Sequence, residues 1–191
     1  MADRFALLYQ ECQNGLGLDE LCSLLMPLGL KLEHPEKDHA IVLDDIGEQW
    51  PIEHVDLRAR LARGDDTTFE IWYSADHDLI CRSRLTNGVR VTHIDLSGTN
   101  EAERISLGQV LREAACNQIL EGGWLGLIFD PDGISAEYDW DKFFLGESPL
   151  SAIEFPEGVP MIFLVSEGLV PRLQGFKIHT SRGGMARVAD E

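Results

Sequence analysis

Hydrophobic and polar residues form their clearest pattern in the middle of the chain. Three runs rich in β-branched and aromatic residues follow one another at residues 69–74, 79–85 and 89–96. Between the last two lies Asn87-Gly88, a dipeptide that favours a two-residue type I′ hairpin turn. Residues that can cap a helix follow at 97–100, and a narrow apolar stripe then continues to about residue 120. The pattern predicts an antiparallel meander followed by a long helix that covers one face of it.

The Asn87-Gly88 turn also fixes the register of the two strands that it joins. Arg84 should face Val91 and Arg82 should face His93 if the turn has two residues. One face of this hairpin is then apolar, with Leu79, Cys81, Leu85, Ile94 and Leu96. The other face is largely polar, with Arg82, Arg84, Thr86, His93 and Asp95. Because a slip by one residue would bury the arginines, the apolar face is predicted to be core.

The parity of the preceding loop decides which aromatic residues join that core. An odd number of residues in the loop around 75–77 would place Phe69, Ile71 and Tyr73 on the core face, whereas an even number would bury Trp72 instead. We expect the odd loop.

The elements on either side of the meander are predicted from the spacing of apolar residues and from residues that end helices. Apolar residues at 3–4 spacing (Phe5, Leu8, Tyr9, Cys12) predict a first helix, and residues 18–26 a second, so that residues 2–29 would form an N-terminal helical pair. Later elements are predicted from similar signals: strands at 30–32 and 40–43, a helix from Pro51 to Arg63, strands at 124–129 and 134–138 joined by the turn 130–133, a short helix at 139–145, and strands at 160–165 and 175–180.

These elements predict an α+β fold. It should consist of a single domain over residues 1–180, with an antiparallel sheet, a long helix packed on one face and the N-terminal helical pair alongside. Residues 181–191 lack an apolar period and are expected to form a flexible C-terminal tail.

The net charge of the chain indicates which classes of partner it can bind. The 191 residues include 33 Asp and Glu against 16 Lys and Arg, which gives a formal net charge of −17. Such a surface repels phosphate backbones, so we do not expect nucleic-acid binding, and it attracts a basic protein. The alternative is that the charge serves solubility alone.

Cofactor, membrane and secretion signals are absent from the sequence. The four cysteines, Cys12, Cys22, Cys81 and Cys116, are widely spaced and do not form the paired pattern of a zinc site. The N-terminus has acidic residues among its apolar ones, and the apolar run at 161–165 is too short to span a bilayer. We therefore expect a cytoplasmic protein with free thiols, no bound metal or cofactor and no membrane partner.

Sequence motifs give no support to catalysis. The segment Asp130-Pro131-Asp132-Gly133 has acids like those of a calcium loop, but a plain turn fits its composition better. Asp76-His77-Asp78 is interpreted as a solvated hairpin loop rather than a metal pair. No nucleophile elbow, phosphate-binding loop or zinc-protease motif occurs, so an enzyme is not expected.

The candidate site is an acidic segment that contains aromatic residues. Between residues 130 and 157 there are eight acids and one base, Lys142. Acids can steer a basic protein, and rigid aromatic side chains can anchor it. The predicted contact residues are Asp130, Asp132, Glu137, Tyr138, Asp139, Trp140, Asp141, Phe144 and Glu147. Arg82, Arg84 and His93 form a second candidate face, whose simplest role is internal pairing with acids and whose alternative role is an anion or nucleotide pocket. The alternative is that the aromatic residues pack inward and the acids form a solvated rim.

These observations predict a protein-binding inhibitor. In its most concrete form it would be an immunity-type protein that binds and neutralises a basic toxin or enzyme. The alternatives are an adaptor or chaperone-like interaction module, and a small enzyme whose active site is not visible as a motif. The sequence does not define the oligomeric state.

Overall fold

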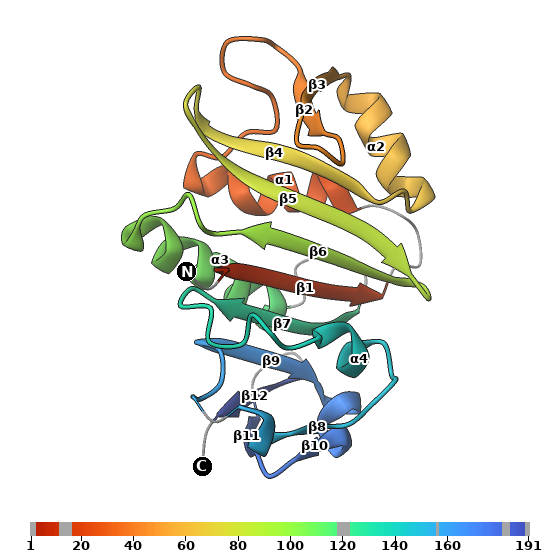
Figure 1. Ribbon diagram of the computed structural model, residues 1–191, viewed down its shortest axis with the longest axis vertical. Coiled ribbons are helices and arrows are strands. Elements are labelled where there is room, and N and C mark those ends of the chain that lie inside the picture. Colours follow the sequence, from red (N-terminus) through yellow and green to blue (C-terminus); the bar gives the residue numbers. More distant parts are fainter. Residues whose placement is uncertain (1–2, 12–16, 118–122, 156, 181–183, 190–191) are drawn as a thin grey trace.

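The computed structural model describes residues 3–11, 17–117, 123–155, 157–180 and 184–189. In this part of the chain, helices surround one ten-stranded antiparallel sheet, so the fold mixes helix and strand as predicted (Figure 1). The order across the sheet is β11-β12-β9-β7-β1-β6-β5-β4-β2-β3. Its strands are β1 (Phe5–Glu11), β2 (Ala40–Leu43), β3 (Gln49–Ile52), β4 (Thr67–Ser74), β5 (His77–Thr86), β6 (Val89–Asp95), β7 (Trp124–Asp130), β9 (Ile162–Ser166), β11 (Lys177–Thr180) and β12 (Met185–Ala189).

The remaining elements are shorter or lie against the sheet. A separate parallel pair is formed by β8 (Leu150–Ser151) and β10 (Leu173–Gln174). The α-helices are α1 (Gly17–Leu25), α2 (His54–Arg63), α3 (Glu101–Asn117) and α4 (Trp140–Phe144). The 3-10 helices are η1 (Met26–Leu28), η2 (Ala152–Glu154) and η3 (Glu167–Arg172).

The hairpin between β5 and β6 has the predicted register. Asn87 and Gly88 both have positive φ, at 53° and 78°, as a type I′ turn requires. Arg84 pairs with Val91 and Arg82 with His93. On the predicted core face, Leu79, Cys81, Ile94 and Leu96 are buried and Leu85 is half-buried. This prediction is confirmed.

The odd-numbered loop predicted between β4 and β5 is not present, although Phe69 and Ile71 face the core as expected. The loop has two residues, Ala75 and Asp76, rather than an odd number. A bulge at Tyr73 shifts the register, so that Phe69 and Ile71 still face the core. Trp72 is buried as well, because it lies on the opposite face of β4 and its ring packs against His34, with ring centroids 4.4 Å apart.

The prediction of an N-terminal helical pair is wrong for its first helix. Residues 5–11 form β1, a central strand that pairs with β6 on one side and β7 on the other. Phe5 and Tyr9 point into one core, whereas Ala6 and Leu8 point into the other. A strand buried on both faces loses its polar alternation, and its apolar run then imitates helical spacing. The second predicted helix is present as α1, while Cys12 lies outside the described residues.

Two hydrophobic cores lie on opposite faces of the sheet. The first packs α1, α2 and α3 against most of the strands, and the second packs α4 and the segments around β8 and η3 against β1, β7, β9 and β12. Figure 1 shows α1 and α3 behind the sheet and α4 in front of it. Helix α3 is capped by Asn100 and Glu103, whose side chains each accept the backbone N–H of the other. None of the helices that the structure describes covers the front of β5 and β6 (Figure 1).

Several other local predictions need correction. Residues 134–138 form turns rather than a return strand, because β7 already pairs with β1 and β9. Residues 30–32 contribute a single bridge, Lys31 to Trp72, while β2 pairs with β3 and β4. Pro51 belongs to β3, and the helix after it begins at His54.

The segment predicted as a C-terminal tail contains a strand. Met185–Ala189 forms β12, which pairs with β9 and β11. Met185, Ala186 and Val188 are buried, so a short run with an Arg in its middle still contributes to both cores. None of the helices described is long and apolar enough to cross a bilayer.

Candidate functional site

The two candidate faces predicted from the sequence meet in one groove. The front of β5 and β6 forms one side, and the loop that leads into α4 forms the other. The groove has a volume of about 370 Å³. Its lining residues are Leu7, Tyr9, Arg82, Arg84, Val91, His93, Tyr138, Asp139, Trp140 and Asp141. Segments far apart in the sequence, from β1, β5, β6 and the loop before α4, therefore form one concave surface.

Asp141 links the two sides of this groove. The hydroxyl of Tyr9 donates a hydrogen bond to its Oδ1 at 2.8 Å, and the guanidinium of Arg84 forms an ion pair with its Oδ2. Burial, and then the neighbouring Asp141 carboxylate, raise the pKa of Tyr9 far above the ordinary range of a phenol. Tyr9 therefore stays protonated and acts as a hydrogen-bond donor rather than as a base.

The cations of the second candidate face are already engaged. Arg82 donates two hydrogen bonds to Asp66, from Nε to Oδ1 at 2.8 Å and from Nη2 to Oδ2 at 2.6 Å. These bonds lower the pKa of the Asp66 carboxyl below its usual range. Burial lowers the pKa of His93, so its ring is neutral near pH 7. Since both guanidinium groups hold carboxylates, this face is not an open anion site.

The aromatic residues of the acidic segment pack mainly inward. Trp140 and Phe144 are 2% and 3% exposed. The ring of Phe144 stacks on Tyr9 with the centroids 4.1 Å apart, and Gly126 of β7 leaves room for it. Trp140 packs edge-on against Phe163 at 5.1 Å. These two predicted contact residues thus support the groove from beneath.

Asp130 is a structural residue in this arrangement. It is completely buried, and its carboxylate accepts hydrogen bonds from the backbone N–H groups of Gly133, Ile134 and Ser135 at 2.7–3.1 Å. The hydroxyl of Ser135 donates a further bond at 2.7 Å. The Asp130-Pro131-Asp132-Gly133 segment therefore forms a turn closed by its own first side chain, as predicted.

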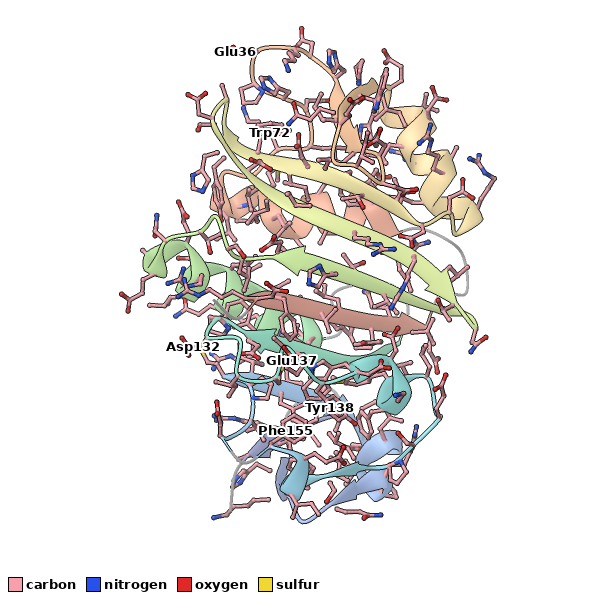
Figure 2. All side chains as sticks on the ribbon, viewed as in Figure 1. Glu36, Trp72, Asp132, Glu137, Tyr138 and Phe155 are labelled. Carbon is pink, nitrogen blue, oxygen red and sulfur yellow. The ribbon has the colours of Figure 1, made fainter. Side chains whose placement is uncertain are left out.

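The other predicted contact residues, which we call the rim, lie along the loop from β7 to α4 and just after α4, and of these Tyr138 and Asp139 line the groove. Asp132, Glu137, Asp139 and Glu147 are exposed, and Tyr138 is half-buried. Figure 2 shows Asp132, Glu137 and Tyr138 along the loop between β7 and α4. Tyr138 packs against Trp140 and Phe155, with ring centroids 4.9 and 5.0 Å away. This rim is the part of the acidic segment that a partner protein can reach.

Sequence reasoning missed Tyr9 as part of the groove. The sequence predicts a helix around Tyr9. In a strand buried on both faces, polar and apolar residues do not alternate, so the sequence gives no sign of the face on which the Tyr9 side chain lies. Internal pairing of Arg84 with an acid is the simplest expectation from the sequence, but no pattern identifies Asp141 as its partner, because the two residues are far apart in sequence. The hairpin register did place Arg84 on the correct face of the sheet.

The groove carries no recognisable catalytic set. Its lining residues include neither serine nor cysteine. Its one histidine, His93, is neutral near pH 7 because burial lowers its pKa. Over the residues that the structure describes, no three His, Cys, Asp or Glu side chains come together as a metal site. Comparisons of the chain with protein-family models, with curated proteins and with solved structures found no match. The groove is therefore interpreted from its own chemistry, which is that of an acidic rim over an aromatic floor.

Proposed function

We propose that this chain is a protein-binding inhibitor of the immunity type, which binds and neutralises a basic toxin or enzyme. The observation that carries the proposal is the excess of carboxylates over cations. Even if every Lys and Arg paired with one acid, seventeen Asp and Glu side chains would remain. A surface with this excess attracts a positively charged protein and accelerates its association.

The internal pairing of cations supports the same conclusion. Arg58 holds Asp19, Arg63 holds Asp65, and Lys142 holds Asp139, in addition to the two pairs at the groove. Other guanidinium groups donate to backbone carbonyls, as Arg172 does to Ser148. Each ion pair neutralises one cation and one carboxylate, so the unpaired carboxylates dominate the charge that a basic partner would meet.

The groove and its rim offer a contact surface of suitable chemistry. The exposed carboxylates of Asp132, Glu137 and Glu147 can steer a basic protein. The space between Tyr138 and Val91 can receive one of its side chains, since the groove is lined by apolar atoms as well as polar ones. A rim of charge around a concave centre is the arrangement found in protein interfaces.

The test is the formation of a stoichiometric complex. The full chain is purified from its native host together with the protein that remains bound to it, and the association rate is measured at increasing salt. We expect a one-to-one complex with a basic protein, whose association slows as salt rises because the attraction is screened. A chain that binds no basic protein at low salt, or that binds an acidic one, would overturn the proposal.

A pair of matched variants examines the role of the rim. Glu137→Lys reverses an exposed charge beside the groove, and Glu113→Lys reverses an exposed charge on α3 at the opposite face of the sheet. Glu137→Lys should slow association by about three- to tenfold at low salt, while Glu113→Lys should have a much smaller effect. Equal effects of the two substitutions would show that the rim is not part of the interface.

A further inference from the structure

The β2–β3 hairpin presents an unusual surface at one end of the sheet. Residues 44–50, which we call the hairpin tip, are all exposed. Ile46 is 81% exposed and Trp50 is 54% exposed. Figure 1 shows β2 and β3 at one end of the molecule, far from β11 and β12 at the other. Two large apolar side chains therefore project into solvent from a single short hairpin.

The hairpin tip is a built structure rather than a loose loop. The side chain of Asp44 accepts the backbone N–H groups of Ile46 at 3.0 Å and of Glu48 at 2.9 Å. The backbone closes the same turn, since Gly47 donates to the Asp44 carbonyl at 3.0 Å and Asp44 donates to the Glu48 carbonyl at 3.1 Å. Gly47 has a φ of +81°, which permits the turn. Little conformational freedom remains to be lost when a partner binds.

Asp44 also holds the indole ring of Trp50. The indole Nε1 donates to Asp44 Oδ2 at 3.3 Å. These hydrogen bonds, led by the one from the Glu48 backbone, keep the pKa of the Asp44 carboxyl below its usual range. One carboxylate thus orients the turn that carries Ile46 and the ring of Trp50 together.

Folding does not explain the exposure of these two side chains. Ile46 occupies a turn position that usually carries Gly, Asn, Asp, Ser or Pro, and Trp50 of β3 leaves more than half of its surface in solvent. Rigid aromatic and branched apolar residues are, however, the side chains that anchor protein interfaces. The hairpin tip therefore has the features of a preorganised anchor for another molecule.

The charge around the anchor indicates what that molecule is. The tip contains Asp44, Asp45 and Glu48 and no basic residue. Beside it, a depression of about 570 Å³ between β3 and α2 is lined in part by Glu53 and Asp56, with Arg60 and Arg63 at the end of α2. Arg63 is paired with Asp65. Carboxylates that surround an apolar anchor complement a partner that has Lys and Arg around an apolar pocket.

The edge of the sheet favours side-chain docking over strand addition. β3 is the last strand of the sheet, and an edge strand can pair with an added strand through its free backbone groups. Pro51 lies within this short strand and has no N–H to donate. Recognition at this end therefore depends on the side chains of the tip.

We propose that the hairpin tip is the anchoring element through which this chain docks on a basic protein. Ile46 and Trp50 insert into an apolar pocket of the partner, and Asp44, Asp45 and Glu48 meet cations at the edge of that pocket. Asp44 acts as a positioning residue. This inference rests on the proposed function, and it adds an apolar anchor at one end of the sheet to the acidic contact surface proposed there.

The experiment uses the basic protein that co-purifies with the full chain as its probe. Ile46→Ser and Trp50→Ser remove one anchor each, and Ile153→Ser is the matched control. Ile153 is 88% exposed in η2, next to β8 at the other end of the molecule. Ile46 and Ile153 project almost wholly into solvent, so these two variants should unfold at nearly the same temperature as the original chain. Trp50→Ser also removes the covered part of the indole ring and its hydrogen bond to Asp44, so it should unfold at a somewhat lower temperature while remaining folded under the binding conditions. Each tip variant should weaken binding by roughly 30-fold or more, the effect of losing an interface hot spot, whereas Ile153→Ser should leave it unchanged.

The outcomes separate the two proposals. If a one-to-one complex with a basic protein forms and both tip variants bind as tightly as the original chain, the docking surface is wrong while the proposed function stands. The same holds if Ile153→Ser weakens binding as much as they do. If no basic protein forms a complex, the proposed function fails and the docking surface fails with it.

Discussion

Replacing Gly126 by alanine should destabilise the protein, because the ring of Phe144 occupies the space that the new methyl group needs. A Cβ atom at this position of β7 would lie 1.9 Å from Cε1 of Phe144 and 2.3 Å from its Cζ. The ring cannot move freely, since it stacks on Tyr9 at 4.1 Å and contacts Phe143 at 5.0 Å. Alanine in place of Gly126 therefore forces a shift within a packed aromatic cluster.

The expected magnitude combines two opposing effects. Overpacking of a well-packed core costs about 1–3 kcal/mol. Replacing glycine by alanine also restricts the unfolded chain, which recovers about 0.4–1 kcal/mol. We expect Gly126→Ala to lower the free energy of unfolding by about 1–2 kcal/mol, which for a chain of this size lowers the unfolding midpoint by about 2–8 °C.

Urea unfolding followed by fluorescence measures this change. The matched control is Gly168→Ala, where an added Cβ would have nothing within 4 Å, and it should alter the free energy of unfolding by less than about 0.5 kcal/mol. Combining Gly126→Ala with Phe144→Leu should cost less than the sum of the two single changes, because the smaller side chain gives way to the methyl group. A Gly126→Ala protein as stable as the Gly168→Ala protein would refute the proposed packing.

Three further predictions follow from the polar contacts and the thiols. The side chains of the Arg84–Asp141 ion pair are about one-third exposed, so Asp141→Asn should lower the free energy of unfolding, measured in urea, by about 1–2 kcal/mol. A loss no greater than that for an exposed ion pair would contradict the contact. Burial raises the pKa of Glu70, whose Oε1 accepts a hydrogen bond from Gln49 at 2.8 Å. The folded state then retains a proton that the unfolded state has lost, so stability should fall as pH rises through this raised pKa, and Glu70→Gln should make unfolding less dependent on pH in that range; an unchanged pH profile would count against it. Burial raises the pKa of the Cys81 thiol far above its ordinary value, so iodoacetamide at pH 8 should modify Cys81 only after unfolding, as mass spectrometry of the peptides can show; rapid labelling of the native protein would disprove this.

The sequence was most informative where structure is set by neighbouring residues. Asn87-Gly88 determined a hairpin register that the structure reproduces pair by pair, because the turn conformation needs only these two residues. Asn100, one of the predicted cap residues at 97–100, caps α3 together with Glu103. Both features are local, so the physical rule that specifies them acts within a few residues.

The sequence was least informative where distant segments decide the structure. β1 is buried on both faces, which removes the alternation that marks a strand, and the strands that pair with it lie about 80 or more residues further along the chain. β12 has Arg187 at its centre and becomes a strand because β9 and β11 flank it. Neither environment is present in the local pattern of residues.

The candidate site, too, could be predicted from the sequence only in part. The exposure of Asp132 and Glu137 agrees with their charge, and composition alone suggested an acidic surface. The inward packing of Trp140 and Phe144 depends on their fit beneath Tyr9 and against β9, which the sequence does not reveal. The alternative in which the aromatics are core residues holds for these two.

The position of β1 has a consequence for how the chain assembles during synthesis. Its partners are β6 and β7, whose residues emerge from the ribosome long after residues 5–11. The strands on either side, β11-β12-β9-β7 and β6-β5-β4-β2-β3, are joined into one sheet by β1. Loop closure over such separations is slow, so the meander β4–β6 should form before β1 finds both neighbours. β1 is therefore made before the strands that pair with it but acquires both neighbours late, and until it is inserted the growing chain exposes two open sheet edges that favour aggregation.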